Sequence, residues 1–289
     1  MNNLIDEQNL PQYSDASILA EIWKTVHRYE VIRTLDIGSF SISAQKGFVL
    51  LTGHVSKKYH RNLIEEIARS IPGVSAIHNK LVVDSDLIIQ VAQALSKDER
   101  TRSFILPVSC SHGWIQLGGE VPSHEVQLAA EEIAAQVPSV RGVLSRPRVI
   151  GEVYEMEQHP IQPQINAKTY DFNRQEGVVS QVVIQPRNRL VTHAVVSAND
   201  FRDSKFVFYE YLVPVEAMEV VDKESIILKR NGPSLNAFPA FEPLDYPLAP
   251  LDWQPPYPYE VSAVRWTCEE HANAENQSVS GKLFRTQDK

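Results

Sequence analysis

The chain has 289 residues, of which 43% are hydrophobic and 22% are charged, and its formal net charge is −8. These values are typical of a globular protein with room for two or three domains, and they exclude a disordered chain. The acidic balance also argues against a nucleic-acid-binding protein that relies on bulk positive charge.

Cysteine usage and the N-terminal residues indicate the compartment. Cys110 and Cys268 are far apart in the sequence, which fits neither a disulfide framework nor a zinc pattern, so two reduced thiols are expected. Residues 1–13, an N-terminal extension, are polar and acidic without the pattern of a secretory leader. No window approaches 18 apolar residues. We therefore expect a cytoplasmic protein without a transmembrane segment.

An internal repeat organises residues 14–150. The run 47–55 (GFVLLTGHV) returns at 113–121 as GWIQLGGEV. Two further blocks, EEIA and IPGV, return as EEIA and VPSV at the same offset of 66 residues. Three matched blocks without an insertion between them indicate a duplicated domain, with copies at 14–84 and 85–150.

Each copy predicts the order helix, two strands, helix, strand, an α+β arrangement with both helices on one face of a sheet. Ser14 is expected to cap the first helix, and either Ser85 or Asp86 its counterpart in the second copy. In the second copy Ser139 replaces a turn glycine, and Pro147 cannot donate a ladder hydrogen bond within the last strand. Glycines with freedom of φ are expected to form the turns, namely Gly47, Gly53, Gly73, Gly113 and Gly119.

These residues resemble a known family. The pattern Gly47-x-Val49-x-Leu51-x-Gly53-x-Val55, the following helix ending in Pro72-Gly73-Val74, and Asn79-x-Leu81-x-Val83 are similar to the BON domain (bacterial OsmY and nodulation). The resemblance implies tandem αββαβ domains of a bacterial type. It also implies a non-enzymatic role in binding phospholipid or protein partners.

Residues 151–232 change to short β-type runs that suggest a small antiparallel barrel. Gly177-x-Val179, the turn at Gln185-Pro186, Leu212-Val213-Pro214 and Ile226-x-Leu228 resemble the PRC-barrel. That resemblance implies a docking domain without an active site.

Residues 233–289 form a tail rich in proline and aromatic residues, with eight of the chain's eighteen prolines between Pro233 and Pro258. One interpretation is a peptide ligand for an aromatic groove on another protein. The preferred alternatives are a strap that packs its rings on the barrel, or a disordered tail.

Candidate sites are few. Cys110 and His112 would share one face of a strand, but no oxyanion turn surrounds them, so we interpret them as structural and expect no catalytic residue. The histidines lack the spacing of metal ligands, so no metal or cofactor is expected. One basic cluster is a candidate binding site for anionic headgroups or phosphates. It contains Lys57, Lys58, Tyr59 and Arg61.

The segment charges agree with that choice. Residues 14–84 carry nine basic against seven acidic residues, whereas residues 151–232 carry nine against twelve. The sequence therefore predicts a non-catalytic scaffold or adaptor that docks to a protein partner or to anionic phospholipid, in a stress- or envelope-related role. The alternative is RNA or ribosome association through residues 151–232. Exposed sheet edges would also allow self-association.

Overall fold

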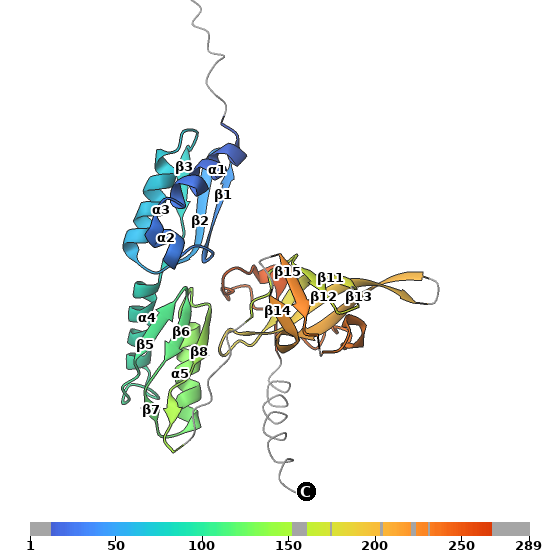
Figure 1. The fold of residues 1–289 in the computed structure, drawn as a ribbon. Coiled ribbons are helices and arrows are strands. Elements are labelled where there is room, and N and C mark those ends of the chain that lie inside the picture. The colour runs from blue at the N-terminus through green and yellow to red at the C-terminus, as the bar shows by residue number, and fades with distance from the viewer. Residues whose placement is uncertain are drawn as a thin grey trace, which may run out of the picture. The chain divides into compact units, whose positions relative to one another are not determined.

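The structure is a computed structural model that describes residues 13–151, 161–173, 175–202, 205–220, 224–230 and 232–267. The chain divides into two compact units. Unit 1 contains the residues up to Gln90 together with Ser109–Gly113, and unit 2 contains Val91–Val108 and the residues from Trp114 onward. Figure 1 shows the elements of both units, coloured along the chain.

Unit 1 is an α+β layer. Its elements are α1 (Asp15–Val26), α2 (Glu30–Leu35), β1 (Phe40–Gln45), β2 (Phe48–Val55), α3 (Lys58–Ser70), β3 (Ala76–Asn79), β4 (Val82–Val83) and the beginning of α4 (Asp84–Lys97). The hairpin β1–β2 is antiparallel, and both β3 and β4 pair with β2 in parallel. Helices α1 and α3 contact each other and the sheet (Figure 1), so they cover the same face.

The amphipathic pattern of α1 explains its packing. The Ser14 hydroxyl accepts the amide hydrogen of Ser17 and caps the helix, as the sequence predicts. Ile18, Ile22 and Val26 recur every fourth residue on the face turned toward the core, and all three are buried. Each such side chain stabilises the fold by about 1.5–3 kcal/mol relative to its exposed state.

Two local expectations need correction. The short helix α2 was absent from the predicted order, because a six-residue helix with one buried side chain, Ile32, is too short to show a periodic pattern. Helix α4 begins at Asp84, so the prediction that Ser85 or Asp86 caps it is wrong. The chain enters α4 directly from β4, which leaves no loop residue to act as a cap.

The second copy has the same plan. Its remaining elements are β5 (Val108–Ser111), β6 (Trp114–Leu117), β7 (Glu120–Val121), α5 (His124–Gln136), β8 (Gly142–Ser145) and β9 (Arg148–Val149). Pro147 lies in the break between β8 and β9, as Leu81 lies in the break between β3 and β4. Pro147 is therefore accommodated where the strand of the first copy is also interrupted.

The rest of unit 2 is built on a seven-stranded sheet. Its strands are β10 (Lys168–Tyr170), β11 (Glu176–Ile184), β12 (Val191–Arg202), β13 (Lys205–Pro214), β14 (Met218–Val220), β15 (Ser225–Leu228) and β16 (Val264–Trp266). The order is β13-β12-β11-β10-β15-β14, with β16 on β11, and the described residues form an open half-barrel. The sheet is mixed and not wholly antiparallel as expected, because β15 and β16 return to the sheet parallel to β10 and β11.

Part of the proline-rich tail belongs to this sheet. The 3-10 helix η1 (Val215–Ala217) connects β13 to β14. The tail adds two further 3-10 helices, η2 (Leu235–Ala237) and η3 (Val261–Ala263), and contributes β16 to the sheet. Phe241, Tyr246 and Tyr259 are buried, so aromatic rings of residues 233–267 pack on the sheet. The expectations for residues 1–12 and 268–289 lie outside the described residues.

Within unit 2 a buried arginine joins the second copy to the sheet. Arg189 lies in the turn between β11 and β12 and donates to the Ala135 carbonyl at the end of α5 at 3.1 Å. It also donates to the Gln254 carbonyl and lies 5.0 Å from the Trp253 ring centroid. Burial lowers the pKa of Arg189 to about 10, which leaves the guanidinium charged at neutral pH.

Close backbone approach completes this junction. The Val143 amide of β8 donates to the Asn188 carbonyl at 2.9 Å. A side chain at the preceding Gly142 would place its Cβ 2.6 Å from the Trp114 ring and 3.0 Å from Leu190. Glycine at this position therefore allows the β11–β12 turn to reach β8.

Candidate functional site

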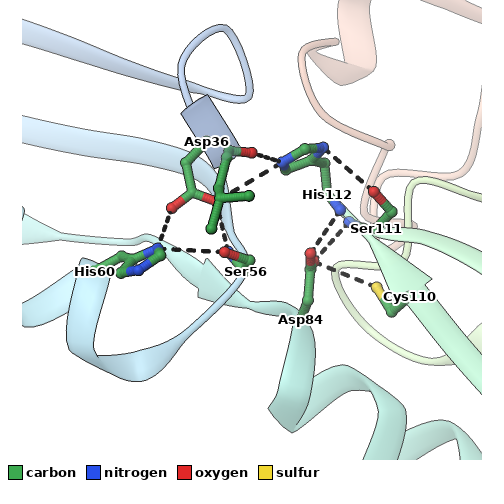
Figure 2. A network of polar contacts seen from close by, with 9 residues as sticks. Asp36, Ser56, His60, Asp84, Cys110, Ser111 and His112 are labelled. Carbon is green, nitrogen blue, oxygen red and sulfur yellow. Dashed lines mark hydrogen bonds and ion pairs between the residues drawn. The ribbon is translucent and has the colours of Figure 1, made fainter. Parts of the chain in front are cut away.

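A buried carboxylate organises a polar cluster in unit 1. Asp36 follows α2, is fully buried, and accepts the Ser56 amide hydrogen at 2.9 Å. His60 in the first turn of α3 lies with Nδ1 2.5 Å from Asp36 Oδ2 (Figure 2). Burial acts to raise the pKa of Asp36, but hydrogen bonds from His112, Ser56 and His60 outweigh it and leave that pKa below its ordinary value. The carboxylate is thus ionised and accepts a hydrogen from His60.

The second copy reaches this cluster through its hairpin turn. His112 lies at φ 52°, and its Nε2 is 2.6 Å from the Leu35 carbonyl oxygen and 3.7 Å from Asp36 Oδ1. The Asp36 carboxylate raises the pKa of His112, and the Leu35 carbonyl and Asp84 add to this effect against desolvation. His112 therefore ties the turn to the end of α2 with a contact that strengthens on protonation.

Asp84 shapes the same turn. Its carboxylate accepts the amide hydrogens of His112 and Gly113 at 2.6 and 2.8 Å. In the first copy Asp15 does the same for the amides of Lys46 and Gly47, at 2.7 and 2.9 Å. An aspartate at the start of a helix thus fixes a two-residue turn with positive φ in both repeats.

The geometry of the cluster does not suit nucleophilic catalysis. Ser56 Oγ and the Asp36 carboxylate both approach the same ring nitrogen of His60, whereas a triad uses opposite nitrogens. Cys110 Sγ lies 3.3 Å from Asp84 Oδ1, and burial together with that carboxylate raises the pKa of the thiol far above its usual range. Cys110 is therefore a poor nucleophile, which favours a structural role.

The described residues offer no metal site, since no three His, Cys, Asp or Glu side chains among them are grouped to hold an ion. Nor does any helix in the described part of the chain have the length and apolarity needed to cross a membrane.

The basic cluster predicted from the sequence lies at the beginning of α3. Lys57 is the N-cap residue, Lys58 and Tyr59 are exposed, and Arg61 is half-buried. His60, between them, is buried against Asp36 and adds nothing to the surface charge. The structure thus presents three of the four predicted residues to solvent on one helical turn.

The five predicted turn glycines all have positive φ, between 75° and 103°. Ser139, in the position of Gly73, also adopts positive φ, at 68°. The second copy therefore keeps this backbone conformation although the Cβ of serine makes positive φ sterically unfavourable.

The sequence did not predict the residues that form the cluster, Asp36, His60 and Asp84. Asp36 and His60 are 24 residues apart, and the corresponding positions of the second copy are Arg102 and Val126, so the repeat did not reveal the pair. The sequence did contain one signal for the aspartates. In each copy an aspartate opens the first helix, and the hairpin turn has glycine as its second residue.

Comparisons with known proteins bear on the first half of the chain. The family model of the BON domain matches residues 14–85 and 83–149. No curated protein matches the chain. Two solved structures of CdsD, a structural protein of the type III secretion system of Chlamydia trachomatis, are similar at 14% identity and a TM-score of 0.37. The match covers 46% of this chain and 60% of the first structure, and 47% of this chain and 66% of the second, its C-terminal domain. Residues 14–149 thus carry two tandem matches to the BON domain.

Proposed function

We propose that the chain is a non-catalytic adaptor that binds a protein partner. BON domains are binding domains, and the geometry of the Asp36 cluster gives it a structural role. The observation that carries the proposal is the exposure of large apolar side chains on both units, including Val31 and Leu35 in unit 1 and Leu244 and Leu251 in unit 2. Apolar groups grouped on a surface are typical of protein-binding sites.

The test is affinity capture with the immobilised full chain from a lysate of the source cells, followed by titration of the retained protein against the purified chain. A saturable, stoichiometric complex at physiological salt is the expected result. Absence of any such complex would contradict the adaptor proposal. Co-sedimentation of the chain with ribosomal subunits would instead support the alternative of RNA association.

Anionic phospholipid is a second candidate ligand, favoured by the exposure of Lys57, Lys58 and Tyr59. Tyr59 is 64% exposed, and the first turn of α3 contains no acidic residue. Each cation near an anionic bilayer contributes about 1 kcal/mol, so this cluster would give weak, salt-sensitive binding.

Flotation of the chain with vesicles of phosphatidylglycerol and phosphatidylcholine tests this candidate. Lys57→Glu with Lys58→Glu is expected to abolish flotation at low salt. The matched control, Lys24→Glu with Lys80→Glu, makes the same change in net charge at exposed positions elsewhere in unit 1 and is expected to float as wild type. Equal flotation of the two double variants would reject the cluster as the lipid site.

A further inference from the structure

Residues 241–254, here called the strap segment, are held firmly on the sheet of unit 2. The Phe241 amide donates to the Glu210 carbonyl at 2.8 Å, and the Trp266 amide donates to the Pro247 carbonyl at 2.9 Å. The rings of Phe241 and Tyr246 stack at 5.7 Å and are buried in the sheet. The strap segment is therefore an ordered surface and not a free peptide.

The outer side of the strap segment exposes three leucines. Leu244, Leu248 and Leu251 are 97%, 57% and 95% exposed, while the intervening Tyr246 and Ala249 are buried. Each leucine directly follows a proline, whose ring fixes φ at about −65°. The leucines are thus presented on a stiffened backbone, which reduces the entropy lost when a partner covers them.

The charged side chains of the strap segment itself are all acidic. Glu242, Asp245 and Asp252 are exposed, and residues 241–254 contain no lysine or arginine. Arg265, which pairs with Leu248 in a β-bridge, is half-buried and donates to the Tyr246 carbonyl and to Gln181. This acidic border opposes anionic membranes and nucleic acid and complements a basic protein surface.

We infer that the strap segment docks into an apolar groove, bordered by lysine or arginine, on a protein partner. Leu244 and Leu251 are the anchors, and the acidic residues Glu242, Asp245 and Asp252 beside them set the orientation. The peptide-ligand interpretation assigned recognition to the aromatic rings, but the structure buries Phe241 and Tyr246 and exposes the leucines. The inference rests on the proposed function, since it names the surface with which the chain holds its protein partner.

The experiment compares the full chain with two double variants in capture from the lysate of the source cells. Leu244→Ser with Leu251→Ser removes the anchors. Ile105→Ser with Ile150→Ser is the matched control, because these isoleucines are also exposed but lie outside the strap segment. All four side chains are largely exposed, so both variants are expected to fold as wild type.

The expected result is one partner that wild type and the control retain equally, with affinity for the strap variant at least about tenfold weaker. The double variant Asp245→Lys with Asp252→Lys is expected to lose more affinity for the partner at low salt than at high salt. If the strap variant retains the partner as well as wild type does, the strap inference fails while the adaptor proposal stands. If light scattering shows wild-type oligomers that the strap variant loses, a second copy is the occupant and the inference is overturned. If wild type retains no partner, the adaptor proposal itself fails.

Discussion

At the scale of single residues, His112 and Asp36 respond to pH in opposite directions. His112 has a raised pKa in the fold, from an ordinary value of 6.5, because Asp36, the Leu35 carbonyl and Asp84 favour its charged form. Its stabilising contribution is therefore complete below pH 6.5 and is lost as pH rises through the folded pKa. Asp36 has a lowered pKa, from 3.8, so its contribution is present above that value and is lost on acidification.

Unit 1 is accordingly expected to lose stability as the pH rises above 6.5 and through the raised pKa of His112. His112→Asn removes the imidazole but retains a residue that suits positive φ before Gly113. Urea unfolding of the full chain, followed by hydrogen exchange of residues 13–90, should show a wild-type decrease on the order of 1 kcal/mol over this range. The variant should lack that decrease. Equal pH dependence in the two proteins would reject the role of His112.

At the scale of elements, the repeat made much of the first half predictable. The 66-residue offset and the periodicity of residues such as Ile18 and Ile22 placed the helices and strands, because local apolar spacing determines which face is buried. The Asp36–His60 pair could not be predicted, because it depends on a tertiary contact of two segments without periodic signal. The parallel pairing of β15 and β16 was missed for the same reason, since the direction in which a strand returns is not encoded locally.

The two copies also differ at the position where β8 approaches the β11–β12 turn. Gly142 of β8 corresponds to Ala76 of β3, and a Cβ at Gly142 would lie 2.6 Å from Trp114, 3.0 Å from Leu190 and 3.2 Å from the Asn188 carbonyl. Glycine at position 142 thus leaves room for the β11–β12 turn beside β8.

Gly142→Ala should therefore destabilise unit 2 by about 1–3 kcal/mol, as is typical of an added methyl group in a packed region. Thermal unfolding and proteolysis near Asn188 are suitable measurements. Ala76→Gly introduces the reverse change on an exposed strand residue of unit 1 and is expected to cost only about 0.5–1 kcal/mol through backbone entropy. A Gly142→Ala protein with wild-type stability would show that the close approach is not required.

At the scale of the whole molecule, unit 2 combines the second copy's α5 and β8 with the half-barrel, while unit 1 has a core of its own. Half-buried arginines also hold the components of unit 2 together. Arg141 donates to the Tyr257 carbonyl at 3.2 Å between the rings of Trp114 and Tyr257, and Arg187 forms an ion pair with buried Glu131 at 3.2 Å. Each of these contacts joins segments that are distant in the sequence. The junction therefore adds to the cooperativity with which unit 2 folds.

Arg189→Met tests whether this junction makes unit 2 one cooperative body. Methionine keeps most of the side-chain volume but leaves the carbonyls of Ala135 and Gln254 without their donor, at a cost of about 1–3 kcal/mol for each buried group. Hydrogen exchange with mass spectrometry should show this loss throughout unit 2, in α5 and β8 as well as in the sheet, while residues 13–90 exchange as in wild type. If only the β11–β12 turn loses protection, the second copy and the half-barrel fold independently, and the junction is only a local contact.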